Sequence, residues 1–108
     1  EKVTVSDEIE RYIVSLVSAT RMRSEFSLGA SPRASVALMK LSRAWAVLHH
    51  RAYVVPDDIA DLFSEAVAHR VTMSREAAAA GIDAVTVLDA VLKSTAVPYA
   101  QTRRGFGI

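Results

Sequence analysis

The sequence predicts a mainly helical fold, a small helical bundle of four to five helices with short extended segments. Only four glycines and three prolines occur in 108 residues, and the common hairpin turns Asn-Gly and Asp-Gly are absent. Apolar residues recur at intervals of three and four, which is the spacing of one face of an α-helix. Serine, aspartate or proline precedes these stretches, as is typical where helices begin.

The first helix is predicted to run from Asp7 to about Arg23. Ser6 is its expected N-cap, and the carboxylates of Asp7 and Glu8 suit the positive end of the helix dipole. Residues 3–5 (Val-Thr-Val) alternate in polarity and predict a short extended arm before it. The predicted buried stripe of the helix consists of Ile9, Tyr12, Ile13, Leu16 and Val17.

The segment 24–30 is expected to be a connector with Phe26 and Leu28 turned inward. Ser31 and Pro32 then predict a second helix, as the capping hydroxyl and the first helical residue. Its expected buried stripe consists of Ala34, Ala37, Leu38, Leu41, Ala44, Trp45 and Leu48. Further apolar residues lie outside this stripe and predict that the helix is the central one: Val36, Met39 and Val47.

A short extended link is expected over residues 51–54, after which Pro56 begins a third helix with Asp57 and Asp58 in its first turn. The predicted buried stripe of that helix consists of Ile59, Leu62, Phe63, Ala66 and Val67. Residues 71–73 (Val-Thr-Met) alternate in polarity, and we expect them to pair with the arm at residues 3–5.

Ser74 is predicted to cap a short alanine-rich helix that ends at Gly81. Asp83 caps the last helix, which a Val-Pro pair at 97–98 stops. The inward residues of this helix are expected to be Val85, Leu88, Val91 and Leu92. The sequence therefore predicts one domain over residues 1–98 and a loosely ordered tail over residues 99–108.

Charge and composition narrow the class of protein. Thirteen Lys and Arg against twelve Asp and Glu give a net charge of +1, so the chain lacks the overall basic field typical of nucleic-acid-binding proteins. Cysteine is absent, which excludes disulfides and thiolate metal sites. The apolar runs are far shorter than the ~20 residues of a membrane span. The chain begins at Glu1 without a signal-peptide pattern, and we expect a piece of a longer cytoplasmic protein.

The sequence predicts no complete active site. His49 and His50 are adjacent, so on a helix their side chains diverge by about 100° and cannot hold one ion together. His69 has no neighbour at metal-ligand spacing, and structural or solvated histidines are the better interpretation. Asp57 and Asp58 diverge in the same way, and the helix dipole explains their position. The chain contains no GxxxxGK[ST] phosphate loop and no nucleophile motif.

The start of the second helix is a candidate phosphate site. Ser31 caps it, Pro32 fixes its first backbone angle, and Arg33 falls at the second helical position, near the positive end of the helix dipole. A guanidinium there can add a bidentate, permanently charged contact to phosphate oxygens. The alternative is a well-capped helix whose arginine points to water.

Several motifs in a fixed order connect this segment with a known family. They are Val-x-Val-Ser-Asp at 3–7, Tyr-Ile-x-x-Leu-Val-x-Ala-Thr-Arg at 12–21, Gly-Ala-Ser-Pro-Arg-Ala at 29–34, Tyr-Val-Val-Pro-Asp-Asp-Ile at 53–59 and His-Arg-Val at 69–71. Together they resemble the C-terminal helical lid of the MoxR family of AAA+ ATPases, as far as about Pro98. The resemblance implies a lid-type bundle that follows a P-loop ATPase core.

The resemblance also implies functional roles for individual residues, together with ligands and partners of the full-length protein. Arg33 matches the sensor-2 arginine, which reaches the γ-phosphate of ATP held by the core, with weaker nucleotide contacts from Ser31 and Pro32. ATP and Mg²⁺ would be bound in the full-length protein, and neither a cofactor nor a metal is expected on the isolated chain. The implied partners are the core, neighbouring subunits of a ring and von Willebrand A domain proteins, on which the ATPase would act like a chaperone. Arg21 matches a family position whose chemical role is open, and ordering of the loop or of a neighbouring interface is the interpretation we favour.

Two departures from the family pattern bear on stability. His50 stands where a helix end favours glycine. Val55 stands where a capping threonine is common, and the lost cap costs ~1 kcal/mol of stability.

Three alternative functions stay open. They are the lid of a magnesium-chelatase-like or helicase-like AAA+ protein, a protein-interaction bundle, and a free-standing nucleic-acid-binding module. The near-neutral charge and the lack of interleaved aromatic residues disfavour the last. The cations of such a nucleic-acid-binding module would be Arg21, Arg23, Arg33, Arg103 and Arg104.

Overall fold

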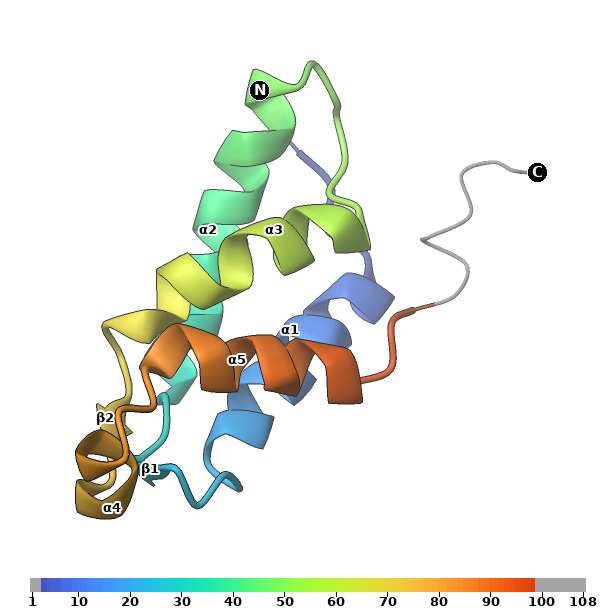
Figure 1. Ribbon diagram of the computed structural model, residues 1–108. Helices are drawn as coiled ribbons and strands as arrows, with labels where there is room; N and C mark the ends of the chain where they lie inside the picture. The colour runs from blue at the N-terminus through green and yellow to red at the C-terminus, as the bar shows by residue number, and fades with distance from the viewer. Residues whose placement is uncertain (1–2, 99–108) are drawn as a thin grey trace.

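The computed structural model of the protein describes residues 3–98 (Figure 1). Those residues form five helices and a two-stranded antiparallel sheet, which confirms the predicted helical bundle with short extended segments. In chain order the elements are α1 (Asp7–Thr20), β1 (Phe26–Leu28), α2 (Pro32–Leu48), α3 (Pro56–Ala68), β2 (Thr72–Met73), α4 (Arg75–Ala79) and α5 (Ala84–Ser94). The tail predicted for residues 99–108 lies outside the described residues. Within residues 3–98, no helix has the length and apolar character needed to cross a bilayer.

Helices α1, α2, α3 and α5 enclose one hydrophobic core, while α4 and the sheet lie together at one end of the bundle (Figure 1). The stripe predicted for α1 is buried throughout, and Ile59, Phe63 and Val67 of α3 are completely buried. Burial of side chains of this size contributes roughly 1.5–3 kcal/mol each. The first helix ends at Thr20, before the predicted Arg23, because the chain turns there toward β1.

Side-chain caps mark four helix starts as predicted. The side-chain oxygens of Ser6, Ser31, Ser74 and Asp83 each accept a backbone N–H of the first turn. In the case of Asp83 this hydrogen bond is the main cause that lowers the pKa of the carboxyl group. Helix α3 follows Val55, which has no side-chain oxygen to cap it, so no side-chain cap hydrogen bond forms at this helix start.

The predicted pairing of residues 3–5 with residues 71–73 is wrong. Thr4 forms a parallel bridge with Tyr53 in the link between α2 and α3, with backbone hydrogen bonds of 2.9 and 3.0 Å on either side. Strand β2 pairs instead with β1, in the segment predicted to be a connector. The arm enters α1 beside the end of α2, whereas β2 follows α3 at the opposite end of the bundle, so the two segments do not meet (Figure 1).

Helix α2 is amphipathic rather than central. Its buried stripe repeats every fourth residue and consists of Ala34, Leu38, Ser42 and Ala46. Leu41 is 42% exposed, Leu48 is 71% exposed and Ala44 is also exposed, although all three were predicted to point inward. Helices α1 and α3 both pack on α2, and because its buried residues form one narrow stripe, the other side stays open.

Two further residues point outward against prediction. Leu28 is exposed because the register of the sheet is irregular between Phe26 and Leu28, so that only Phe26 reaches the core. On α5, Val85 is exposed, whereas Val87, which was not predicted to point inward, is buried. Both errors concern which side of an element faces inward and leave the elements themselves unchanged.

The end of α2 has a residue in the left-handed backbone region. His50 has φ +59°, and hydrogen bonds of 2.9 Å from His50 N–H to Val47 O and from Arg51 N–H to Ala46 O close the helix around it. Gly81 has φ +80° at the corresponding position after α4. A side chain in this conformation costs roughly 1–2 kcal/mol, whereas glycine adopts it readily.

We therefore expect His50→Gly to raise the free energy of unfolding by about 0.5–1 kcal/mol. This value is the relief of backbone strain less the extra freedom that glycine gives the unfolded chain. Urea unfolding of the 108-residue chain measures it. His50→Ala is the control, because alanine removes the imidazole and keeps the strain. Equal stabilisation by both variants would contradict the backbone explanation.

Candidate functional site

Arg33 lies in the first turn of α2, as predicted. Ser31 is the N-cap, whose Oγ accepts the Arg33 N–H at 3.3 Å, and Pro32 is the first helical residue. The Arg33 side chain is exposed, and its guanidinium has no hydrogen bond or ion pair to any residue between 3 and 98. It can therefore receive an anion from outside the bundle.

The backbone at this helix end is largely occupied. The N–H of Arg33 is bound by Ser31, the N–H of Ala34 donates to Ser31 O at 2.9 Å, and Pro32 has no N–H. Positive charge for an anion comes from the Arg33 guanidinium, with the helix dipole adding to it. That Ser31 and Pro32 also touch a nucleotide stays a prediction.

The loop before α2 is fixed at Ala30, which is completely buried. The Ala30 N–H donates to Thr20 Oγ1 at 2.9 Å, and the Ala30 carbonyl accepts a hydrogen bond from Arg21 Nη1 at 2.6 Å. Gly29 lies against the same residues, because a Cβ on Gly29 would be 2.7 Å from both the N and the Cα of Arg21. The end of α1 and the start of α2 are thus locked together.

Sequence reasoning missed Thr20 and assigned Arg21 no definite role. A signal for Thr20 was present, since it continues the buried stripe of α1 three residues after Val17 and four after Leu16. A polar residue on an apolar helix face is buried at a cost unless it is hydrogen-bonded, so its position pointed to a partner. The identity of that partner, Ala30, depends on tertiary structure.

A bidentate ion pair lies at the other end of α2. Arg51 Nη1 and Nη2 donate to Asp58 at 2.8 and 2.6 Å, and Asp58 also accepts the N–H of Val55 at 2.9 Å. The hydrogen bonds to Asp58 raise the pKa of the Arg51 guanidinium above its usual value. Both Asp58 oxygens are engaged, so this carboxylate holds the link between α2 and α3 rather than acting as an acid or base.

The three histidines are exposed, as solvated or structural histidines would be. His49 Nδ1 lies 2.9 Å from the carbonyl of Trp45, and the two rings are 4.7 Å apart between centroids. Within residues 3–98, no group of three or more His, Asp or Glu side chains is arranged to hold a metal ion.

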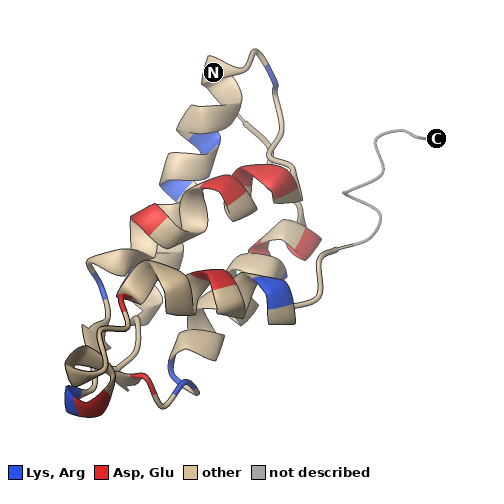
Figure 2. Cartoon of the chain, in the orientation of Figure 1, with Lys and Arg blue, Asp and Glu red and all other residues tan. Residues whose placement is uncertain are grey.

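Charges are separated between two neighbouring helices. The charged side chains of α2 are all basic and those of α3 are all acidic (Figure 2). The exposed side of α2, which we name its outer face, combines these cations with apolar residues. The outer face consists of Arg33, Val36, Lys40, Leu41, Arg43, Ala44, Val47 and Leu48. Arg33 therefore lies at one end of a surface that is basic and apolar.

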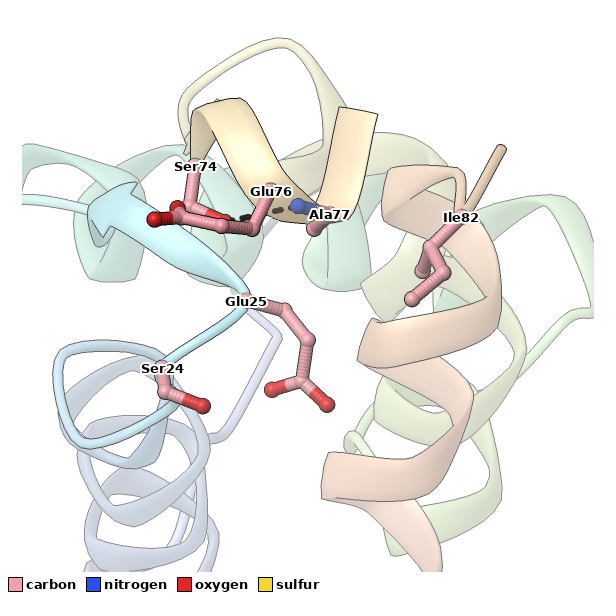
Figure 3. A pocket seen from close by; sticks show the side chains of 6 residues that line it. All are labelled: Ser24, Glu25, Ser74, Glu76, Ala77 and Ile82. Carbon is pink, nitrogen blue, oxygen red and sulfur yellow. Dashed lines mark hydrogen bonds between the residues drawn. The ribbon is translucent and has the colours of Figure 1, made fainter. Parts of the chain in front are cut away.

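A shallow hollow of about 490 Å³ lies between the start of β1 and α4 (Figure 3). It presents two carboxylates, those of Glu25 and Glu76, and Ser74 in this hollow caps α4. The pKa of Glu25 is lowered, chiefly by a backbone hydrogen bond, which favours its charged form. The hollow is acidic and does not suit a phosphate, so it offers no alternative to the candidate phosphate site predicted at Arg33.

Comparison with known proteins identifies the type of domain. Residues 18–91 match the AAA lid domain family. The uncharacterized protein YeaC of Bacillus subtilis is 42% identical over 98 residues, which cover 91% of this chain and 31% of YeaC. The chaperone MoxR1 of Mycobacterium tuberculosis is 32% identical, over 81% of this chain and 26% of MoxR1.

A solved structure agrees with these relatives. The crystal structure of a putative ATPase from Cytophaga hutchinsonii superposes with a TM-score of 0.85 at 33% sequence identity. The match covers 90% of this chain and 32% of the ATPase. The chain thus spans only about a third, or less, of the length of the proteins it matches.

Proposed function

The chain belongs to the AAA lid domain family, as the lid domain of a MoxR-like AAA+ ATPase, and from this premise we propose that it closes over ATP held by the P-loop core of the same longer protein. The observation that carries the proposal is Arg33, an exposed guanidinium without an acceptor in residues 3–98, at the start of a helix. Such a group matches the charge and geometry of phosphate oxygens.

Arg33 acts in this proposal as the sensor-2 residue. It contacts the γ-phosphate and stabilises the negative charge that develops during phosphoryl transfer, a contribution that depends on its being held in place beforehand. The acidic residues of the described chain form no metal cluster, so Mg²⁺ would be held by the core. ATP supplies the phosphoryl group when bound, and this chain supplies the guanidinium and part of the cover that keeps water out.

The outer face of α2 is the surface that meets the core. It exposes four large apolar side chains beside its cations: Val36, Leu41, Val47 and Leu48. Exposed apolar patches rimmed by polar groups are typical of interaction surfaces. Packing of the core against this face would bring its nucleotide to Arg33, and closure would couple the ATP state to the angle between the two domains.

The finer function is chaperone-like remodelling of partner proteins by a ring of such subunits, with von Willebrand A domain proteins as clients. The similarity to MoxR1, which is named a chaperone, supports this role over a magnesium-chelatase-like or helicase-like one. A nucleic-acid-binding module is disfavoured because Arg21 and Arg23 are engaged by Ala30 and Glu25. Arg103 and Arg104 lie outside the described residues.

Hydrolysis by separated parts tests the proposal. We expect the 108-residue chain alone to hydrolyse no ATP above buffer, because it contains no P-loop motif. The full-length protein from which these 108 residues are deleted is expected to turn over ATP at least about 100-fold more slowly than the intact full-length protein. Phosphate release measured for the three forms gives the comparison. Hydrolysis by the purified 108-residue chain, or full activity without it, would contradict the proposal.

A further inference from the structure

We propose that Thr20 and Arg21 are positioning residues for Arg33. They fix the backbone of Ala30 and, through it, the orientation of the first turn of α2 from which Arg33 extends. The inference rests on the function proposed above for Arg33. Thr20 and Arg21 form their hydrogen bonds within this chain, and their proposed role requires no contact with the nucleotide.

The first observation is that Ala30 is held from two sides. Its N–H binds Thr20 Oγ1 at 2.9 Å and its carbonyl binds Arg21 Nη1 at 2.6 Å. Because Thr20 and Arg21 are consecutive, both bonds come from one point at the end of α1. Hydrogen bonds are directional, so two bonds on opposite sides of one residue fix its orientation as well as its position.

The second observation is that the two anchoring side chains are themselves held. Thr20 is completely buried, and its hydroxyl donates to Val17 O at 2.6 Å while it accepts from Ala30. Arg21 Nη2 also donates to Ser18 Oγ at 3.2 Å. The guanidinium of Arg21 is thereby directed into the chain, in contrast to that of Arg33.

The segment from Ala30 to Arg33 transmits this position. Ser31 is fixed as the N-cap of α2, and the ring of Pro32 locks its backbone φ near −65°. No flexible residue separates the fixed Ala30 from Arg33. Loss of either anchor would let the first turn shift, and a displacement of about 1 Å at a reacting centre can cost as much as 10²-fold in rate.

The test is a set of mutant cycles in the full-length ATPase, with kcat and KM for ATP as readouts. Thr20→Val and Arg21→Ala are each expected to lower kcat about ten-fold, while Thr20→Ser, which keeps the hydroxyl, stays within about two-fold of wild type. In an Arg33→Ala background the same substitutions should cause no further fall, because their effect passes through Arg33. Arg23→Ala is the matched control, since Arg23 lies in the same loop and pairs with Glu25.

The outcomes separate the two proposals. If Arg33→Ala leaves kcat unchanged, the proposed function fails. If Arg33→Ala lowers kcat but Thr20→Val and Arg21→Ala do not, or if their effects multiply with that of Arg33→Ala, the positioning role is overturned while the function stands. Thermal melting of each variant reports on folding. Arg21 is exposed, so Arg21→Ala keeps the test decisive even if Thr20→Val fails to fold.

Discussion

In the full-length ATPase, replacing Arg33 with alanine is expected to lower ATP turnover about 100-fold. The guanidinium is exposed, has no partner in the described chain, and is held at the start of α2 by the cap and loop before it. Removing one preorganised donor from a developing negative charge typically costs 10²–10³-fold in kcat. Steady-state phosphate release at saturating ATP measures the loss.

Two variants control this experiment. Arg11→Ala removes an exposed arginine of α1, outside the outer face of α2, and turnover should stay near wild type. Arg33→Lys should fall between wild type and Arg33→Ala, because lysine keeps the charge and loses the planar fork. Since Arg33 is exposed, thermal melting should be unchanged in both Arg33 variants. Unchanged turnover in Arg33→Ala would remove this residue from the nucleotide site.

Local patterns account for what could be predicted of this fold. Four caps, the buried stripe of α1 and the end of the short helix at Gly81 are each read from residues within one or two turns. The position of Arg33 follows from the same local rules, because Ser31 and Pro32 define where α2 begins. The same rules made this helix start a candidate phosphate site, with an arginine that points to water as the alternative, and the predicted sensor-2 role came from the resemblance.

Contacts between distant segments account for what could not be predicted. The partner of Thr20 is Ala30, and that of the arm at residues 3–5 is the α2–α3 link, which periodicity does not reveal. The outward side of α2 was misjudged for a related reason. Its sequence is apolar over more than one face, and only the packing of α1 and α3 decides which face is covered. If the outer face meets the core, its exposed apolar residues form an interface with another domain and do not indicate a helix at the centre of the bundle.

At the other end of α2, Arg51→Met is expected to lower the free energy of unfolding by about 3 kcal/mol. The Asp58 side chain is only 3% exposed, and without Arg51 its charge keeps just one hydrogen bond, from the Val55 N–H. Breaking a buried pair by removing one partner typically costs 3–5 kcal/mol, because the other charge stays buried. The partial exposure of Arg51 places this case at the lower end. Urea unfolding of the 108-residue chain measures the change.

Arg23→Met is the matched control, since it removes the same kind of side chain from a pair with Glu25 whose partners are 32% and 29% exposed. That pair should contribute at most about 1 kcal/mol and weaken with salt, because water screens it. Equal losses in the two variants would mean that burial of Asp58 has no special weight. Arg51 lies at the opposite end of α2 from Arg33, so Arg51→Met should keep normal ATP turnover in the full-length protein below its melting temperature. If Arg51→Met loses stability but keeps turnover, a lower stability of the lid does not by itself reduce kcat. A fall in kcat on substitution of Thr20, Arg21 or Arg33 would then reflect the loss or displacement of the Arg33 guanidinium.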